Sequence, residues 1–90
     1  MTPEVSIIIP VHNEGFRLRE TIEAIAQTAD VPYEVVVVDD VSTDGCCDSL
    51  NGVRLLRLNH PAGVAGARNA GAAAALAPIL LFLDGHCYPE

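Results

Sequence analysis

The sequence contains no lysine, and its five basic residues, all arginines, face twelve carboxylates for a formal net charge of -7. A Walker-type phosphate loop and a Schiff-base mechanism are excluded, because each of them requires a lysine amine. The arginines are not concentrated in any one stretch. This acidic balance argues against nucleic acid or an anionic membrane surface as a partner.

Long apolar runs are also missing. No run approaches the roughly 20 residues that a membrane-spanning helix needs, and residues 1–4 lack the basic and apolar regions of a signal peptide. The three cysteines form no even set and no Cys-x-x-Cys spacing, which favours a reducing compartment. The adjacent pair, Cys46 and Cys47, is expected to pack in the core.

What the sequence does contain is aliphatic: half of its 90 residues are hydrophobic, and only four are aromatic. Branched apolar runs predict strands at residues 5–9, where Pro10 ends the first of them, and at 33–38, 53–58 and 79–83. Helical spacing predicts helices from about residue 14 to 29 and over 64–77, with a stunted helix at 46–50. The alternation predicts an α/β domain: a Rossmann-like parallel sheet in the order β-α-β-α-β-α-β, with right-handed crossovers.

Acidic residues follow two of the predicted strands. Asp39 and Asp40 end the second, and Asp84 follows the fourth. Because open α/β sheets bind ligands outside the carboxyl ends of their strands, these residues predict a polar site at one edge. Asp39 and Asp40 are candidates to accept hydrogen bonds from a base or ribose. The alternative, that Asp40 and Asp44 only cap the next turn, is equally compatible with the pair.

Our hypothesis is that Asp84 and His86 bind a metal ion. The glycine between them allows a tight turn to aim a carboxylate and an imidazole at one point, a donor set that suits Mn²⁺ or Mg²⁺. On spacing alone, an Asp-Gly turn beside a solvated histidine is the more frequent case.

Three polar residues, His12, Asn13 and Glu14, follow the first strand at the same predicted edge. His12 is positioned to contact a nucleotide. Asn13 has a simpler role as the cap of the following helix, and Glu14 as a carboxylate at the helix N-terminus.

Arg68 is a candidate phosphate ligand, because it lies in the first turns of a predicted helix whose free amides also favour anions. The simpler alternative is a surface arginine on an alanine-rich helix. The nearby glycines, Gly63, Gly66 and Gly71, do not form the dinucleotide fingerprint and are expected to allow close packing of this helix on the sheet.

Four blocks, taken together, resemble the family 2 glycosyltransferases. They are VSIIIPVHNE at residues 5–14, VVDDVSTDG at 37–45, GVAGARNAG at 63–71 and FLDGH at 82–86. The resemblance implies an inverting enzyme of the GT-A fold, of which residues 1–90 are the N-terminal, nucleotide-sugar-binding portion without the acceptor and catalytic-base half. Val41 stands where the family often has glycine.

The resemblance also implies roles for individual residues. Asp40 is similar to the acid that contacts the base, and Asp84 with His86 matches an Asp-x-Asp metal motif in its Asp-x-His form, which implies Mn²⁺ or Mg²⁺. The implied nucleotide-binding residues are Pro10, His12, Asn13, Glu14, Asp39, Asp40, Arg68 and Asp84.

The implied reaction is metal-assisted transfer of a sugar from a nucleotide-diphosphate sugar, preferentially a UDP-sugar, to a saccharide, lipid or protein acceptor. A cytoplasmic location is expected, with the full-length enzyme at the cytoplasmic face of a membrane as an alternative. No catalytic base is identifiable, so we expect these 90 residues alone to be inactive.

Two other classes of function are compatible with the residues. One is a noncatalytic nucleotide-binding remnant that forms homo-oligomers through an exposed sheet edge. The other is a receiver-like signalling module, which fits less well because such modules use a lysine.

Overall fold

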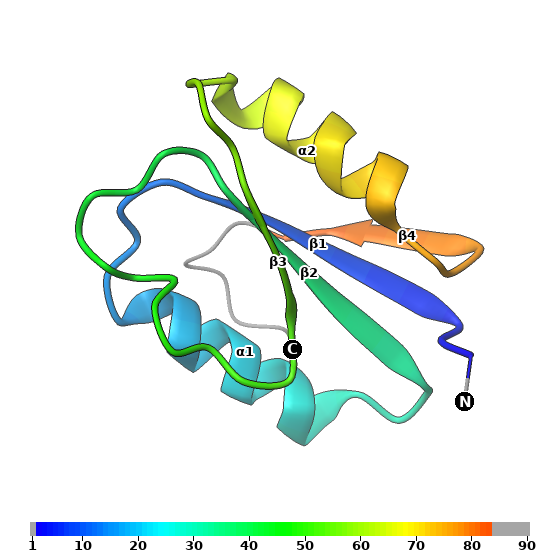
Figure 1. The fold of residues 1–90 in the computed structure, drawn as a ribbon. Coiled ribbons are helices and arrows are strands. Elements are labelled where there is room, and N and C mark those ends of the chain that lie inside the picture. The colour runs from blue at the N-terminus through cyan, green and yellow to red at the C-terminus, as the bar shows by residue number, and fades with distance from the viewer. Residues whose placement is uncertain (1, 84–90) are drawn as a thin grey trace.

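The computed structural model describes residues 2–83, which form a four-stranded parallel sheet with a helix on each face (Figure 1). In chain order the elements are β1 (Val5–Val11), α1 (Arg17–Thr28), β2 (Tyr33–Asp39), β3 (Arg54–Arg57), α2 (Gly63–Ala74) and β4 (Ile79–Phe82). The strand order is β3-β2-β1-β4, and every neighbouring pair is parallel. The predicted α/β class and Rossmann-like parallel sheet are confirmed.

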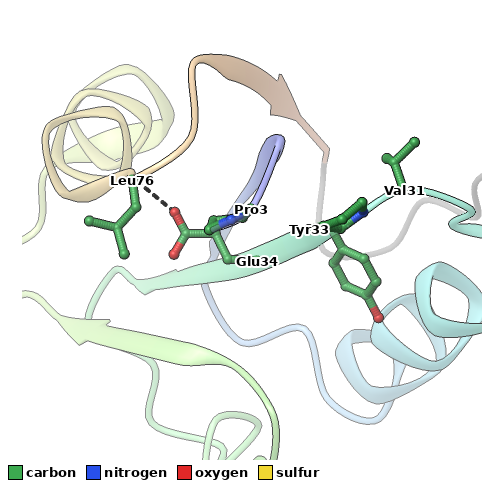
Figure 2. A pocket seen from close by; sticks show the side chains of 6 residues that line it. Pro3, Val31, Tyr33, Glu34 and Leu76 are labelled. Carbon is green, nitrogen blue, oxygen red and sulfur yellow. Dashed lines mark hydrogen bonds between the residues drawn. The ribbon is translucent and has the colours of Figure 1, made fainter. Parts of the chain in front are cut away.

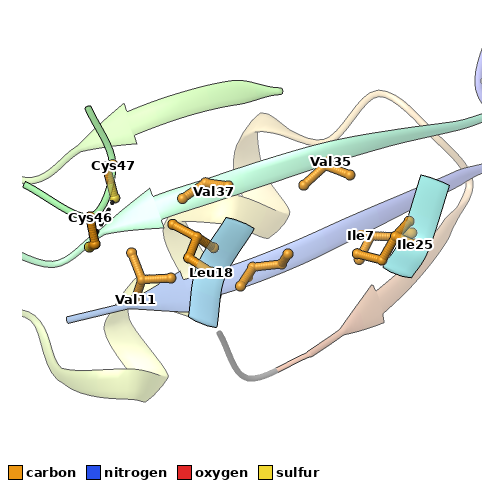
Figure 3. Packing of buried hydrophobic residues seen from close by; sticks show 9 residues of the cluster. Ile7, Val11, Leu18, Ile25, Val35, Val37, Cys46 and Cys47 are labelled. Carbon is orange, nitrogen blue, oxygen red and sulfur yellow. Dashed lines mark hydrogen bonds between the residues drawn. The ribbon is translucent and has the colours of Figure 1, made fainter. Parts of the chain in front are cut away.

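The two central strands, β1 and β2, are buried on both faces, which is why their sequences are continuous apolar runs. On one face Leu18 and Ile25 of α1 pack against Val35 and Val37, as Figure 3 shows. On the other face Ala67 of α2 joins a second cluster, whose other members are Ile8, Val36 and Val38. The predicted end of the first strand at Pro10 is wrong: β1 continues through this buried residue to Val11, because the fixed φ of proline is compatible with extended backbone.

Helix α1 begins later than predicted. It starts at Arg17, and the residue before it, Phe16, makes no side-chain capping hydrogen bond. Asn13 and Gly15 take φ values of 52° and 60°, a left-handed conformation that a right-handed helix cannot include. The capping role considered for Asn13 is therefore wrong, and its side chain bonds elsewhere, as described below.

The stunted helix predicted at residues 46–50 is absent, and residues 46–49 form turns instead. Cys46 and Cys47 are buried at 6% and 2% exposure, with their Sγ atoms 3.7 Å apart. The short connection from β2 to β3 thus contributes two cysteine side chains to the core, where a helix would have contributed one of its faces. Burial raises the pKa of the Cys47 thiol. Both side chains belong to the buried cluster on the α1 face, so their predicted packing role is confirmed.

Helix α2 ends at Ala74, three residues before its predicted end. The Ala75 amide still bonds to the Ala72 carbonyl, but the two amides after it bond to side chains. The Leu76 amide donates to Glu34 Oε2 at 2.7 Å, a contact visible in Figure 2, and the Ala77 amide donates to Ser6 Oγ at 3.0 Å. Ser6 Oγ in turn donates to Glu34, and Arg54 pairs with the same carboxylate at 2.9 Å. Glu34 therefore connects the end of α2 to the amino end of the sheet.

Replacing Glu34 with glutamine should lower the free energy of unfolding by about 2 kcal/mol at pH 7, because the new NH2 group replaces one carboxylate oxygen and must oppose either the Leu76 or the Arg54 donor. Burial by itself raises the pKa of Glu34, but hydrogen bonds from Ser6, Leu76 and Arg54 outweigh it, and the net pKa lies below its usual value of 4.5. A carboxylate with a lowered pKa adds stability above its usual pKa and loses it as the pH falls through the lowered value.

Urea unfolding of the two proteins at pH values from 7 down to 3.5 should thus show a difference that narrows below about pH 4.5. Glu23→Gln, on the exposed side of α1, controls for the loss of one negative charge. A difference independent of pH would contradict the role of the ionised carboxylate.

The two edges of the described sheet differ in character. β3 carries the charged residues Arg54 and Arg57, whereas β4 is entirely apolar, and its four side chains are 40% to 58% exposed. Charged residues protect edge strands from pairing with other chains, so only the β3 edge is protected in this way. Neither α1 nor α2 is long and apolar enough to cross a membrane.

Candidate functional site

Three loops meet at the carboxyl edge of the sheet, as the strand ends predicted. They are the β1–α1 loop at residues 12–16, the β2–β3 loop from residue 40 onward, and residues 58–62 before α2. Side chains from the first two loops carry most of the hydrogen bonds that join them.

Asp40 lies where the three loops converge and is partly exposed. Its Oδ1 accepts the Ala62 amide at 2.8 Å, its Oδ2 accepts the Gly63 amide at 3.0 Å, and its main-chain oxygen accepts from His12 Nδ1 at 2.7 Å. The first amides of α2, expected to be available to an anion, are thus bonded to this carboxylate. Each carboxylate oxygen has a second lone pair, which leaves Asp40 able to accept from a ligand as well.

Asp39 is buried, with 3% of its surface exposed, and both of its carboxylate oxygens have partners in the protein. Oδ1 accepts the Ser42 amide at 2.9 Å, and Oδ2 accepts from Arg57 Nη1 at 3.2 Å. The ion pair between Asp39 and Arg57 was not predicted from the sequence. The register of β2 and β3 sets these residues side by side, so an arginine at the end of β3 was the available signal.

Asn13 connects the β1–α1 loop to the β2–β3 loop. Its Oδ1 accepts the amides of Thr43 at 2.7 Å and Asp44 at 3.2 Å, and its own amide donates to Ser42 Oγ at 3.0 Å. Its Nδ2 lies 3.4 Å from His12 Nε2. Because His12 Nδ1 donates to a carbonyl, Nε2 is the acceptor in this contact.

Asp44 strengthens the same connection from the opposite side. Its Oδ2 accepts the Gly15 amide at 3.0 Å, and its Oδ1 accepts the Cys46 amide at 2.9 Å. The hydrogen bond from Cys46 is the main reason why the pKa of Asp44 lies below its usual value. The predicted role of Asp44 in capping the next turn is confirmed.

Arg68 and the glycines lie on α2. The exposed Arg68 stacks its guanidinium 5.9 Å from the centroid of the Phe82 ring on β4, a cation–π contact. A Cβ added to Gly71 would overlap Ile8 Cγ2, so the predicted close packing is confirmed for this glycine. Gly63 instead begins the helix at a φ of 73°, with open space around it.

Two further predicted residues belong to β1 and to the loop that follows it. Pro10 is buried within β1, and the partly exposed Glu14 lies in the loop after it. The predicted metal ligands Asp84 and His86 lie outside the described residues. Within residues 2–83, no three His, Cys, Asp or Glu side chains are grouped so that they could hold a metal ion.

Many open α/β folds have a parallel sheet with polar loops at its carboxyl edge, and this one is similar to the structures of GT-A glycosyltransferases. The family model "Glycosyl transferase family 2" matches residues 6–90. The chain therefore belongs to glycosyltransferase family 2.

Curated relatives are similar over nearly the whole chain. Human polypeptide N-acetylgalactosaminyltransferase 15 is 35% identical over 96 residues, which cover 94% of this chain and 15% of the relative. Glycosyltransferase AglE of Haloferax volcanii is 34% identical over 97 residues, which cover 98% of this chain and 32% of the relative. The chain thus spans a third or less of the length of these relatives.

Two solved structures with bound ligands are also similar. S. aureus TarS 1-349 in complex with UDP-GlcNAc has a TM-score of 0.82 and 30% identity, over 94% of this chain and 27% of that one. The mannosyltransferase PcManGT from Pyrobaculum calidifontis, in complex with GDP-Man and Mn²⁺, has a TM-score of 0.79 and 28% identity, over 98% and 29%.

Proposed function

We propose that this chain binds a nucleotide-diphosphate sugar, preferentially a UDP-sugar, at the carboxyl edge of its sheet and forms the donor site of a sugar transferase. The observation that carries the proposal is the position of Asp40. Two backbone amides fix its carboxylate at the point where three loops converge, yet it remains partly exposed. Family membership and the nucleotide sugars bound by similar structures support it.

The chemistry of Asp40 suits a nucleobase with an N–H group. A carboxylate only accepts hydrogen bonds, and the two amides leave one lone pair on each oxygen. Uracil offers a single ring N–H, and guanine offers a ring N–H with an amino group. Because the carboxylate is already held in place, little conformational entropy is lost when the base binds.

The divalent cation belongs to the same proposal. Asp84 and His86 supply oxygen and nitrogen donors, which fit Mn²⁺ or Mg²⁺. The Leu83 amide donates to the Ile8 carbonyl at 3.0 Å, so the described chain leaves the sheet at the carboxyl end of β4, directly before Asp84. A cation bound there would stabilise the negative charge of the diphosphate leaving group.

Calorimetric titration of UDP and GDP into the chain, with and without Mn²⁺, tests this proposal. We expect UDP to bind in the presence of Mn²⁺, at least tenfold more weakly to Asp40→Asn, because the new amide group cannot accept at both positions. His86→Ala should remove the dependence on Mn²⁺. Asp30→Asn, an exposed residue before β2, is the matched control and should bind as the wild type does.

Circular dichroism must first show that each variant is folded. If the folded wild-type chain binds neither nucleotide at millimolar concentration, the donor-site proposal is wrong. If Asp40→Asn binds UDP as tightly as Asp30→Asn does, the assigned role of Asp40 is wrong.

A second proposal, self-association, rests on β4. Antiparallel pairing of two β4 edges would satisfy the backbone groups on the open side of each strand. It would also bring the side chains of Ile79, Leu80, Leu81 and Phe82, which are 40% to 58% exposed, beside those of the second copy. Light scattering over a range of concentrations should show dimers that Leu81→Lys weakens. A wild-type monomer at millimolar concentration would contradict self-association.

A further inference from the structure

We infer that Asn13 is a positioning residue: its side chain holds the β2–β3 loop in the conformation that presents Asp40 to the nucleotide. The inference rests on the proposed function and assigns Asn13 an indirect role in it. Asn13 was predicted from the sequence as a helix cap or as a nucleotide ligand. Its hydrogen bonds to the β2–β3 loop identify a different task.

The first argument is where these hydrogen bonds go. Asn13 Oδ1 accepts two consecutive backbone amides, those of Thr43 and Asp44, 30 and 31 residues further along the chain. The Asn13 amide donates to Ser42 Oγ. One residue thus fixes three successive positions of the loop that follows Asp40. Both amides would otherwise need water, since backbone donors are rarely left without partners.

The second argument is the backbone strain next to Asp40. Val41 has a φ of 57°, a left-handed conformation that costs an L-residue roughly 1–2 kcal/mol. Such a conformation persists only where surrounding contacts enforce it. The Asp40 amide bonds to the Val11 carbonyl at 2.8 Å before Val41, and the Ser42 amide bonds to Asp39 after it. Beyond Ser42, the contacts of Asn13 hold the loop.

The left-handed backbone at Val41 directs Asp40 and residues 42–44 to different parts of the protein. Before it, the Asp40 carboxylate points to the start of α2, where it accepts from Ala62 and Gly63. After it, residues 42–44 turn toward Asn13. If the hydrogen bonds between Asn13 and residues 42–44 were lost, Val41 could relax to a negative φ, and the direction of the Asp40 side chain would change with it.

A second contact reaches Asp40 through His12. Asn13 Nδ2 is the donor in its contact with His12 Nε2, and His12 Nδ1 donates to the Asp40 carbonyl. Asn13 therefore acts on Asp40 from the β1 side as well as through the loop. The neutral amide of Asn13 fits this arrangement, because it supplies an acceptor and a donor from one side chain.

The test is a set of UDP dissociation constants measured with Mn²⁺ present. Asn13→Ala should weaken binding about tenfold or more. Asn13→Asp should stay within threefold of the wild type, because aspartate keeps the acceptor for both amides, tolerates a left-handed backbone and loses only the long 3.4 Å contact to His12. The exposed Asn51, in the turn before β3, provides the control Asn51→Ala, which should bind as the wild type does.

A double-mutant cycle with Val41→Gly separates positioning from a general loss of stability. Glycine adopts a positive φ without cost, so the hydrogen bonds of Asn13 are needed less to hold position 41 in that conformation. Asn13→Ala should therefore weaken UDP binding threefold or less in the Val41→Gly background, against tenfold in the wild type. Equal losses in both backgrounds would overturn the inference, because the two residues would then not be coupled.

The remaining outcomes are also decisive. A folded wild-type chain that does not bind UDP overturns the proposed function and this inference together. A wild-type chain that binds, with Asn13→Ala binding equally well, overturns the inference alone, as does an Asn13→Asp variant as weak as Asn13→Ala. If Asn13→Ala does not fold, Asn13→Ser replaces it, and binding as tight as that of the wild type would overturn the inference.

Discussion

Replacing Gly71 with alanine should lower the free energy of unfolding by about 2 kcal/mol, although alanine is the better helix former. The added Cβ would overlap Ile8 Cγ2 and would lie 3.1 Å from Val38 Cγ2. Both neighbours are fully buried strand residues with no room to move aside. Helix α2 must therefore shift away from the sheet, which would weaken its packing. Asp40 holds the start of the same helix through the Ala62 and Gly63 amides. Urea unfolding measures the loss.

The double mutant with Ile8→Ala tests whether this contact is the cause. Ile8→Ala alone should cost about 3 kcal/mol, because it leaves a cavity in the sheet. The alanine at position 71 would partly fill that cavity, so the double mutant should be at least about 1 kcal/mol more stable than the sum of the two losses predicts. Strictly additive losses would show that the strain arises elsewhere.

Replacing Asp39 with alanine should lower the free energy of unfolding by about 3 kcal/mol, because a buried carboxylate with hydrogen bonds to both oxygens is lost. The Ser42 amide would lose its acceptor, and Arg57 would lose its buried partner. We place the value at the low end for a broken buried ion pair, because the Arg57 side chain is 54% exposed and water can solvate it.

The same arginine provides the control. Asp48 binds Arg57 Nη2 at 3.1 Å, but its side chain is 68% exposed. Asp48→Ala should therefore cost about 0.5 kcal/mol, as exposed ion pairs do. Equal losses for Asp39→Ala and Asp48→Ala would contradict the importance of burial at Asp39. Urea unfolding of both variants at pH 7 decides between these outcomes.

Local sequence was sufficient where the burial of an element is uniform. β1 and β2 are buried on both faces, so their apolar runs predicted strands without reference to other residues. The start of α1 was wrong because Asn13 and Gly15 adopt left-handed conformations. The helix at residues 46–50 was wrong because Cys46 and Cys47 pack in the core instead.

The location of the candidate site could be predicted from the sequence, but its contacts could not. Parallel strands bring their carboxyl ends to one edge, so the sequence located Asp40, His12 and Asn13 together. It did not predict what they contact. Asp40 binds the start of α2, and Asn13 binds residues in a loop 30 positions away. Such partners depend on how the elements pack.

The sequence by itself determined the family, the strands and the presence of acids at the strand ends, because these follow from residue order and apolar periodicity. Only the tertiary structure decided which acid does what. Asp39 is the last residue of β2 and faces the core, where Arg57 of β3 meets it, whereas Asp40 follows the strand and remains partly exposed. Because β2 ends between these two residues, Asp39 has the neighbours of a strand residue and Asp40 those of a loop residue, so neighbours in sequence can differ completely in their surroundings.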